Sequence, residues 1–204
     1  MKKYEFTGEV KVKFGVTFKR IRALIDFGNV KKGELGGFIE KEENLSHKNN
    51  AWVYGNARVY DNAEVYGNAR VSGNAEVSDN ARVYDDAEVS GNARVSGNAE
   101  VSGNAEVSDN AEVYGNAEVY GNAEVSGDAD YVLIGRIGSR LGFTTFFRNK
   151  NNGVSVSCGC FFGTLAEFRE SVKEKHGTDT KFAKVYQTAA DLAELQIGHN
   201  EKAD

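Results

Sequence analysis

A six-residue phrase repeats without insertion or deletion from Ala51 to Asp128 and dominates this chain of 204 residues. The phrase reads Ala-Glu/Arg-Val-Tyr/Ser-Gly/Asp-Asn, with alanine at every sixth position from Ala51 and valine two residues later from Val53 to Val125. A fixed short period of this kind is typical of a solenoid, in which each unit buries its apolar face by stacking on its neighbours.

The spacing within the phrase predicts strands joined by corners. Side chains alternate along a strand, so the alanine and valine of each phrase share one face and the Glu or Arg between them points the other way. The Gly or Asp that precedes Asn tolerates left-handed backbone angles, so the chain is expected to turn every six residues. Alanine and valine are therefore expected to line the interior of the rod.

An aliphatic residue followed four places later by a small one, as in Val53 and Ala57, makes the repeat similar to the hexapeptide-repeat family of left-handed parallel β-helices. The resemblance implies that three hexads make one triangular coil, wound with a left hand. Many members of that family are trimeric acyltransferases that use a CoA donor, a histidine base in the coils and a protruding loop. This chain has uninterrupted hexads and no histidine between His47 and His176, so an acyltransferase is not expected.

Three parts are predicted in a mainly β chain: a β cap at residues 1–38, the solenoid at 39–130 and a small α+β domain of ββαα type at 131–204. The cap is expected to form strands at residues 4–7, 9–14 and 16–27, with tight turns at Gly8 and Gly15. Counting back from Ala51 in sixes puts Ile39 and Leu45 in the inward, small-residue phase, so the first coil is expected to begin near Gly37.

The last part is predicted to contain strands at residues 131–134, 144–148 and 154–160, followed by two helices. Thr164 and Glu167 form a capping box that starts a helix, and Gly177 is placed to end it. A second helix is expected within residues 181–195. Its predicted inward stripe consists of Phe182, Val185, Tyr186, Ala189, Leu192 and Leu195.

Charge is unevenly distributed along the chain. Residues 51–130 carry 15 Asp and Glu against 4 Lys and Arg, a net charge of −11, which excludes the solenoid as a grip for a nucleic-acid backbone. If residues eighteen apart stack, Arg58 lies on Glu76 and Glu76 lies on Arg94. The sign alternates from hexad to hexad only as far as Arg94, and beyond it Glu112 is expected to stack on Asp130. The acidic positions that follow are either a solvated face or a binding surface: Glu100, Glu106, Glu112, Glu118, Glu124 and Asp130.

The chemistry of the last part has two alternatives. The glycine-rich stretch at residues 135–142 supplies candidate anion-binding groups, or it is only a turn; the candidates are Arg136, Ser139, Arg140 and Thr164. Cys158 and Cys160 are expected on one strand face as core or near-core thiols, because two thiols do not make a zinc site. His176 is expected to cap the first helix, or alternatively to pair with a cysteine as a nucleophile.

The chain as a whole, with its Gly-Glu-Leu-Gly-Gly-Phe-Ile entry and Ser-Cys-Gly-Cys-Phe-Phe-Gly-Thr-Leu exit, is similar to a group of β-solenoid proteins of tailed phages and prophages. The resemblance implies an accessory protein that blocks a host function or defence system by binding. We expect a non-enzymatic scaffold without cofactor or metal, with a protein partner that has a basic surface. Self-association as a dimer or trimer is a further prediction.

The competing hypothesis is an enzyme or a nucleotide- or anion-binding protein with its site in residues 131–204. No run of eighteen apolar residues or signal-peptide core occurs, so a membrane location is not expected. Two cysteines agree with a reducing compartment, and the expected location is the cytoplasm, that of the host cell if the protein is phage-encoded.

Overall fold

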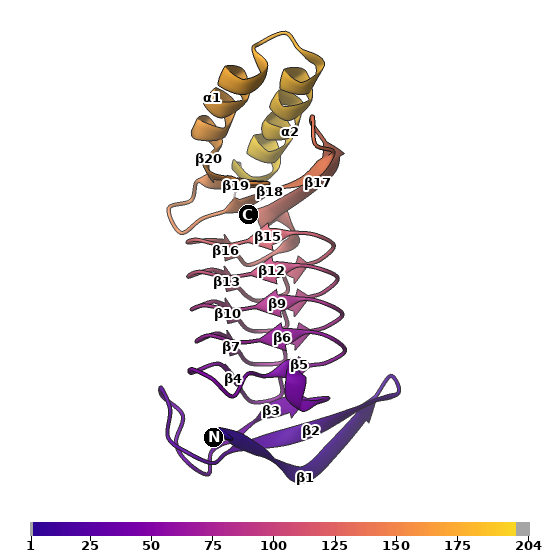
Figure 1. Cartoon of the computed structure of the whole chain (residues 1–204), viewed down its shortest axis with the longest axis vertical. Coiled ribbons are helices and arrows are strands. Elements are labelled where there is room, and N and C mark those ends of the chain that lie inside the picture. The colour runs from indigo at the N-terminus through magenta and orange to yellow at the C-terminus, as the bar shows by residue number, and fades with distance from the viewer. Residues whose placement is uncertain (1, 199–204) are drawn as a thin grey trace, which may run out of the picture.

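The computed structural model describes residues 2–198 and shows a rod with a β cap at the N-terminal end and an α+β unit at the C-terminal end (Figure 1). The rod is a parallel β-solenoid of two-residue strands, as predicted. The strands are β4 (Trp52–Val53), β5 (Arg58–Val59), β6 (Glu64–Val65), β7 (Arg70–Val71), β8 (Glu76–Val77), β9 (Arg82–Val83), β10 (Glu88–Val89), β11 (Arg94–Val95), β12 (Glu100–Val101), β13 (Glu106–Val107), β14 (Glu112–Val113), β15 (Glu118–Val119) and β16 (Glu124–Val125).

Every third strand pairs in parallel, which gives the rod three faces. The sheet orders are β5-β8-β11-β14, β6-β9-β12-β15 and β4-β7-β10-β13-β16. Val89, for example, lies between Val71 and Val107, its neighbours in the coils before and after. Residues eighteen apart therefore stack, and the prediction of three hexads per coil is confirmed; the left hand of the coil stays a prediction.

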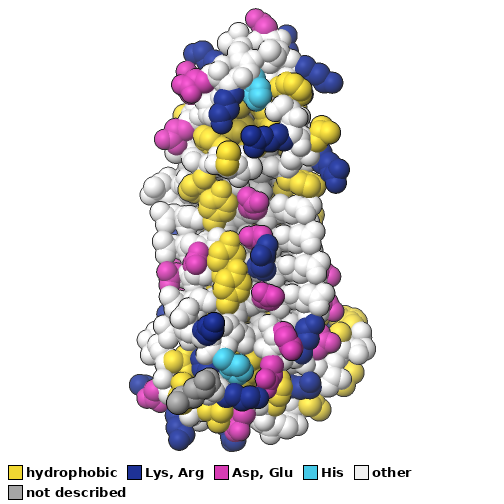
Figure 2. Space-filling model, in the orientation of Figure 1, with side chains coloured by type: hydrophobic (Ala, Val, Ile, Leu, Met, Phe, Trp, Pro, Cys, Tyr) yellow, Lys and Arg dark blue, Asp and Glu magenta, His cyan; other side chains and the backbone are white. Residues whose placement is uncertain are grey.

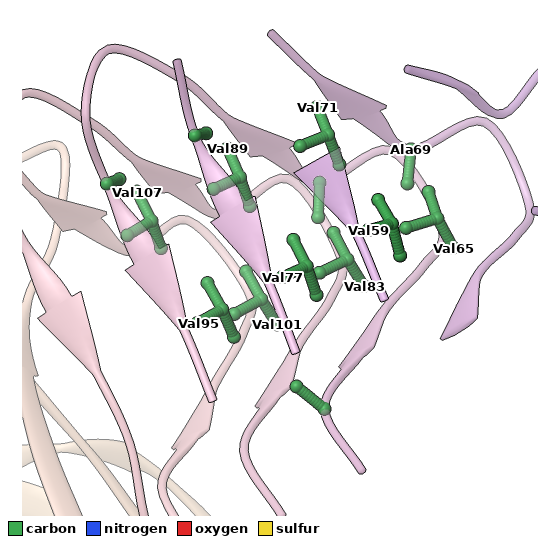
Figure 3. Close-up of a cluster of buried hydrophobic side chains, with 14 of the residues drawn as sticks. Val59, Val65, Ala69, Val71, Val77, Val83, Val89, Val95, Val101 and Val107 are labelled. Carbon is green, nitrogen blue, oxygen red and sulfur yellow. The ribbon is translucent and has the colours of Figure 1, made fainter. Parts of the chain in front are cut away.

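The interior of the rod is built from the alanines and valines of the repeat. Each of them, from Ala51 to Val125, is at most 1% exposed. Figure 3 shows valines such as Val77, Val89 and Val95 pointing from successive coils into the same interior. Burial of this continuous apolar column is the main force that holds the coils together, because no single coil can remove its own apolar face from water.

The corners stack backbone on backbone. A Cβ atom on Gly91 would lie 2.8 Å from the backbone nitrogen of Asp109 in the next coil, so a side chain pointing that way would push the coils apart. Both residues have a positive φ, 66° and 52°, which explains why only Gly or Asp occupies this position. Beside the corner, the Asn92 amide donates to the Asn110 Oδ1 across 3.1 Å, and similar Asn ladders run along the rod.

The N-terminal cap differs from the prediction at two points. It comprises β1 (Tyr4–Lys13), β2 (Val16–Ala23) and β3 (Leu35–Ile39), so β2 ends earlier than expected. Gly8 does not make a turn: it lies inside β1 with φ 90°, where the pairing with β2 shifts register, as in a β-bulge. The turn at Gly15 is confirmed, and β3 continues into the rod by parallel pairing with β5.

The first coil is longer than the others. Ile39 pairs with Val59 and Leu45 with Val65, a separation of twenty residues instead of eighteen. Both side chains are buried, as expected, but they occupy the valine positions of the stack and not the alanine positions. The loop that connects Leu45 to Val53 therefore holds two extra residues, which the counting in sixes could not detect.

Lys3 closes the bottom of the rod from within the cap. Its side chain is 1% exposed, and its Nζ donates to the carbonyl oxygens of Ala51 across 2.7 Å and Asn49 across 3.3 Å. Burial lowers the pKa of this amine from its usual value to about 8. The Lys3 ammonium thus provides hydrogen bonds to the Asn49 and Ala51 carbonyls, which lie next to β4 at the end of its sheet.

The C-terminal unit is a four-stranded antiparallel sheet covered on its outer face by two helices (Figure 1). A short 3-10 turn at Asp128–Asp130 leads into it. The strands β19 and β20 form a hairpin where one longer strand was predicted. The elements are β17 (Tyr131–Ile137), β18 (Gly142–Arg148), β19 (Val154–Cys158), β20 (Phe161–Thr164), α1 (Leu165–His176) and α2 (Lys181–Gly198).

The sheet seals the last coil with one face and supports the helices with the other. On the inner face, Phe147 joins the core of the rod, and the Thr145 Oγ1 accepts from the Glu118 backbone N–H across 3.0 Å. On the outer face, Phe146 and Val156 pack with Phe168 of α1 and with the alanines of α2. The alternation along β18 thus assigns neighbouring residues to two separate cores.

The helix ends follow the sequence, but the buried stripe of α2 matches the prediction only at Tyr186 and Ala189. Glu167 Oε2 accepts from the Thr164 N–H across 2.8 Å, which confirms the capping box, and Gly177 ends α1 with φ 72°. Leu192 and Leu195 are 48% and 67% exposed. Phe182 is exposed as well; the buried residues of α2 are Ala183, Tyr186, Ala189, Ala190, Ala193 and Ile197.

The close packing of α2 explains why its leucines are exposed. Alanines let α2 lie close to the sheet and to α1, so the small residues face inward and the leucines face outward.

Neither helix in residues 2–198 has the length and apolar character that a membrane span requires.

Candidate functional site

One cavity of the C-terminal unit is lined by the β17–β18 loop, the turn after β19, the carboxyl end of α1 and residues of the rod. Its volume is about 360 Å³. The residues that line it come from all of these segments: Asn116, Glu118, Ser139, Arg140, Gly142, Phe143, Thr145, Ser157, Cys158, Gly159, Cys160, Phe161, Phe168, Ser171, Val172, Lys175, His176 and Tyr186. We call it the junction pocket.

The β17–β18 loop is held against α2 by a close contact. A Cβ atom on Gly138 would lie 1.8 Å from the Tyr186 hydroxyl oxygen, so only glycine leaves room for this phenol. Gly138 and Leu141 have positive φ values of 73° and 48°, which turn the loop sharply. The result is that Ser139 and Arg140 lie at the rim of the pocket.

The two cysteines occupy different environments within the pocket, contrary to the prediction of two core thiols on one strand. The strand ends at Cys158, which is half-buried and whose sulfur accepts from the Thr144 hydroxyl across 3.1 Å. Cys160 lies in the turn between β19 and β20 and is exposed. Burial raises the pKa of the Tyr186 phenol, and the adjacent Cys158 thiol adds to that rise.

Cationic and hydrogen-bonding side chains gather at the outer rim of the pocket. Arg140, Lys175 and His176 line it, and the His176 ring stacks on Tyr186 with centroids 5.8 Å apart. Within residues 2–198, neither Arg140 nor Lys175 forms a salt bridge. Several other cations of the unit are paired, such as Arg169 with Asp191 across 2.6 Å.

The structure divides the predicted anion-binding set. Ser139 and Arg140 line the junction pocket, but Thr164 caps the opposite end of α1 and Arg136 is exposed on β17 outside the pocket. Lys175 and His176 were not in the predicted anion-binding set, because their approach to the loop depends on how α1 crosses the sheet. The predicted Cys-His pair is also unsupported. Cys158 accepts a hydrogen bond from Thr144, and no hydrogen bond joins Cys158 to His176 among the described residues.

No group of three or more potential metal ligands occurs in the part of the chain that the structure describes. The cysteines, His176 and Glu118 therefore do not form a metal centre together. The arrangement can bind through charge, hydrogen bonds and apolar contact.

The acidic positions of the rod are separated onto its three faces. Glu106 stacks on Glu124, Glu100 on Glu118, and Glu112 on Arg94, as the eighteen-residue spacing predicts. Several are neutralised: Glu112 binds Arg94 across 2.7 Å, Glu100 binds Arg82, and Glu106 binds Lys150 across 2.6 Å. Glu118 accepts from the Ser157 hydroxyl across 2.8 Å at the edge of the junction pocket.

Asp130 does not belong to this acidic surface. It is 8% exposed, and its Oδ1 accepts from the Arg148 Nε across 2.6 Å at the base of the C-terminal sheet. The expected stack of Glu112 on Asp130 is therefore wrong, because the chain leaves the hexad register in the 3-10 turn. Glu124 remains exposed, with no cationic partner in residues 2–198.

Comparison with known proteins supports the repeat class. A family model described as the YdcK β-solenoid repeat matches residues 63–77 and 87–103, both within the rod. No curated protein matches the chain. The match and the fold together make this a β-solenoid repeat protein with an added α+β unit.

Proposed function

We propose that this protein acts by binding, with the solenoid as a rigid spacer and the C-terminal unit as the contact surface for a protein partner. The carrying observation is an apolar row on the outer face of α2, made of Val185, Leu192 and Leu195, which we call the α2 row. Residues three, four and seven apart share one side of a helix, so these three side chains form one strip.

The row faces away from the rest of the unit. Arg169 of α1 binds Gln187 across 2.7 Å and Asp191 across 2.6 Å, which fixes the flank of α2 next to the row against α1. Leu192 is about half exposed and Leu195 about two-thirds exposed, whereas the buried flank of the same helix is closely packed with alanine. Exposed leucines in a row are typical of a surface that a partner covers.

The charge beside the row indicates a partner with a basic flank. The carbonyl of Ile197, near the end of α2, accepts from Arg148, which anchors this end above the last coil. Exposed Glu124 and Asp128 lie on that coil, and neither forms a salt bridge within residues 2–198. A basic surface next to an apolar groove would satisfy both features and would be steered by the net charge of the rod.

The rod itself is suited to a spacer role. Many of its outward groups are satisfied by neighbouring coils: arginine binds glutamate, as Arg70 binds Glu88 across 2.8 Å, and asparagine binds asparagine. A side chain already held within its own ladder has less to offer a partner. The C-terminal unit exposes more varied groups than the rod, from the leucines of α2 to the cations of the junction pocket, which favours this unit over the rod as the recognition surface.

The proposed biological setting is that of an accessory protein of a phage or prophage, acting in the host cytoplasm on a host or defence factor. The support is the similarity of the hexads and of the two flanking segments to such proteins. Binding without chemistry suffices for this role, because covering the working surface of a host factor is enough to block it.

The test uses the full chain to capture a partner from host cells, followed by affinity measurement with the purified partner. Replacing the row with Leu192→Ser and Leu195→Ser should weaken binding by about tenfold or more, since buried leucines contribute a large share of such contacts. The matched control is Val10→Ser with Val12→Ser, which removes two apolar side chains that are 55% and 71% exposed at the opposite end.

Two results would overturn the proposal. One is a partner that binds the row variant and the control variant equally well. The other is a wild-type dimer or trimer that only the row variant dissociates in sedimentation experiments, because a second copy of this chain would then cover the row.

A further inference from the structure

The geometry points to the junction pocket as a binding site for a small organic anion, one with a phosphate or carboxylate group on a flat apolar body. This inference is independent of the protein partner proposed for the α2 row. It rests on three features of the pocket: unpaired cations at the rim, an aromatic wall and a volume of about 360 Å³. Ligand pockets commonly enclose about 300 to 1,000 Å³.

The rim favours an acidic group. Arg140 and Lys175 lack salt-bridge partners within the described residues, although the whole chain carries 30 acidic against 25 basic residues. Ser139 and His176 add hydroxyl and imidazole groups at the same rim. Figure 2 shows Lys and Arg side chains beside a histidine near exposed apolar side chains at this end of the molecule. Cations brought together without carboxylates are a common arrangement for binding phosphate or carboxylate.

The wall favours a flat apolar body. Phe161, Phe168, Val172 and Tyr186 line the pocket, and the rings of Phe161 and Phe168 lie 5.4 Å apart. Tyr186 also stacks on His176, so aromatic surface continues from the wall to the rim. A bare inorganic anion would leave this wall without a partner, whereas an aromatic ring would cover it.

Two features of the pocket disfavour an anion: the negative end of the α1 dipole and the Glu118 carboxylate. The first is reduced by hydrogen bonds, and the second lies on the opposite side of the pocket from the cations. The carboxyl end of α1 carries a partial negative charge, but its Lys173 carbonyl accepts from the Gly177 N–H across 2.8 Å and its His176 carbonyl from the Thr180 hydroxyl across 2.8 Å. Glu118 lies on the solenoid side of the pocket, where it accepts from Ser157. The acidic group of a ligand is therefore assigned to the Arg140 and Lys175 rim, away from Glu118.

The experiment titrates the full-length protein with 1-naphthyl phosphate and 1-naphthoate, and monitors amide and side-chain shifts by NMR. Neutral 1-naphthol and inorganic phosphate are the two matched half-ligands. Both naphthyl anions should bind at least about tenfold more tightly than either half, because charge and apolar contact act together. The order of the two anions identifies the preferred acidic group. Shifts should concentrate at Ser139, Arg140, Cys158 and His176.

Arg140→Gln and Lys175→Gln should each weaken binding of the preferred anion by about tenfold. Lys173→Gln is the matched control: it lies on the same helix, is exposed, pairs with Glu170 and does not line the pocket. All three changes are at solvated side chains, and thermal melts establish that the variants remain folded.

A second readout is the modification rate of Cys160, an exposed thiol of the pocket. The bound naphthyl anion should slow this reaction in the wild type and fail to do so in Arg140→Gln at the same concentration. The inference is wrong if neither naphthyl anion binds at millimolar concentration, if 1-naphthol or inorganic phosphate binds equally well, or if Lys173→Gln weakens binding as much as Lys175→Gln.

Discussion

Asp130 and Arg148 form an ion pair across the boundary between the rod and the C-terminal sheet, with 2.6 Å between Asp130 Oδ1 and Arg148 Nε. Each side chain is about one-tenth exposed. The second Asp130 oxygen accepts from the backbone N–H groups of Ser126 and Gly127, and Arg148 also donates to the Ile197 carbonyl. This pair therefore ties the last coil, the sheet and α2 together.

Breaking this pair should destabilise the protein strongly. Arg148→Met leaves the Asp130 carboxylate buried without a cation, and we expect the free energy of unfolding to fall by about 3 to 5 kcal/mol. The control is Arg94→Met, which removes a solvated pair with Glu112 and should cost less than about 1 kcal/mol. Urea denaturation of both variants measures the difference, and equal losses would contradict the role assigned to Asp130.

The period of the rod predicts which deletions the fold tolerates. Removing residues 75–110 takes out two whole coils. It brings Arg58 onto Glu112 and Arg70 onto Glu124, so opposite charges still stack on two faces, whereas Glu64 then meets Glu118 on the third. Removing residues 75–101 breaks the hexad phase and points polar residues inward. Circular dichroism melts should show a cooperative transition for the first variant only. A cooperative melt of both would mean that the coil is not built from three hexads.

The like-charge stack of Glu106 and Glu124 offers a test of surface electrostatics. Glu124→Arg places a cation beside Glu106, which already binds Lys150, and we expect the free energy of unfolding to change by less than about 1 kcal/mol at low salt. The same change removes negative charge next to the α2 row, so association with a basic partner should slow. Stopped-flow association rates at several salt concentrations measure this effect, and an unchanged rate would make the acidic positions a solvated face.

The buried Lys3 amine should make the free energy of unfolding depend on pH in the alkaline range. Its pKa is about 8 in the folded protein and near 10.5 when unfolded, so between these values the unfolded chain binds more protons. The free energy of unfolding should therefore rise with pH from about 8 to 10, by up to about 1 kcal/mol per pH unit, relative to Lys3→Met. Denaturation at pH 7 and pH 9.5 compares the two proteins. Parallel profiles would show that the Lys3 amine titrates normally.

The two thiols should differ in reactivity and bind no metal. Cys160 is exposed and should react quickly with Ellman's reagent, whereas Cys158 is half-buried beside Thr144 and should react slowly. Replacing both with alanine should cost at most a few kcal/mol. Elemental analysis is expected to find no stoichiometric zinc, and one zinc per chain would refute this assignment.

The sequence alone was sufficient to predict the rod. Each hexad repeats the same local choices, inward Ala and Val, outward Glu or Arg and a Gly or Asp corner, and each coil contacts only its neighbours. Contacts such as Arg94 with Glu112 then follow from the eighteen-residue spacing without further information. The capping box at Thr164 and Glu167 was equally predictable, because its hydrogen bonds are local.

Only the tertiary structure determined the features in which residues from distant parts of the chain come into contact. Asp130 fits the acidic run by period, yet Arg148, eighteen residues later in another strand, makes it a buried ion pair. The outward position of Leu195 follows from the alanine packing of α2 against the sheet and α1. The junction pocket likewise exists because α1 brings Lys175 to the loop that carries Arg140, and no sequence period relates those two residues.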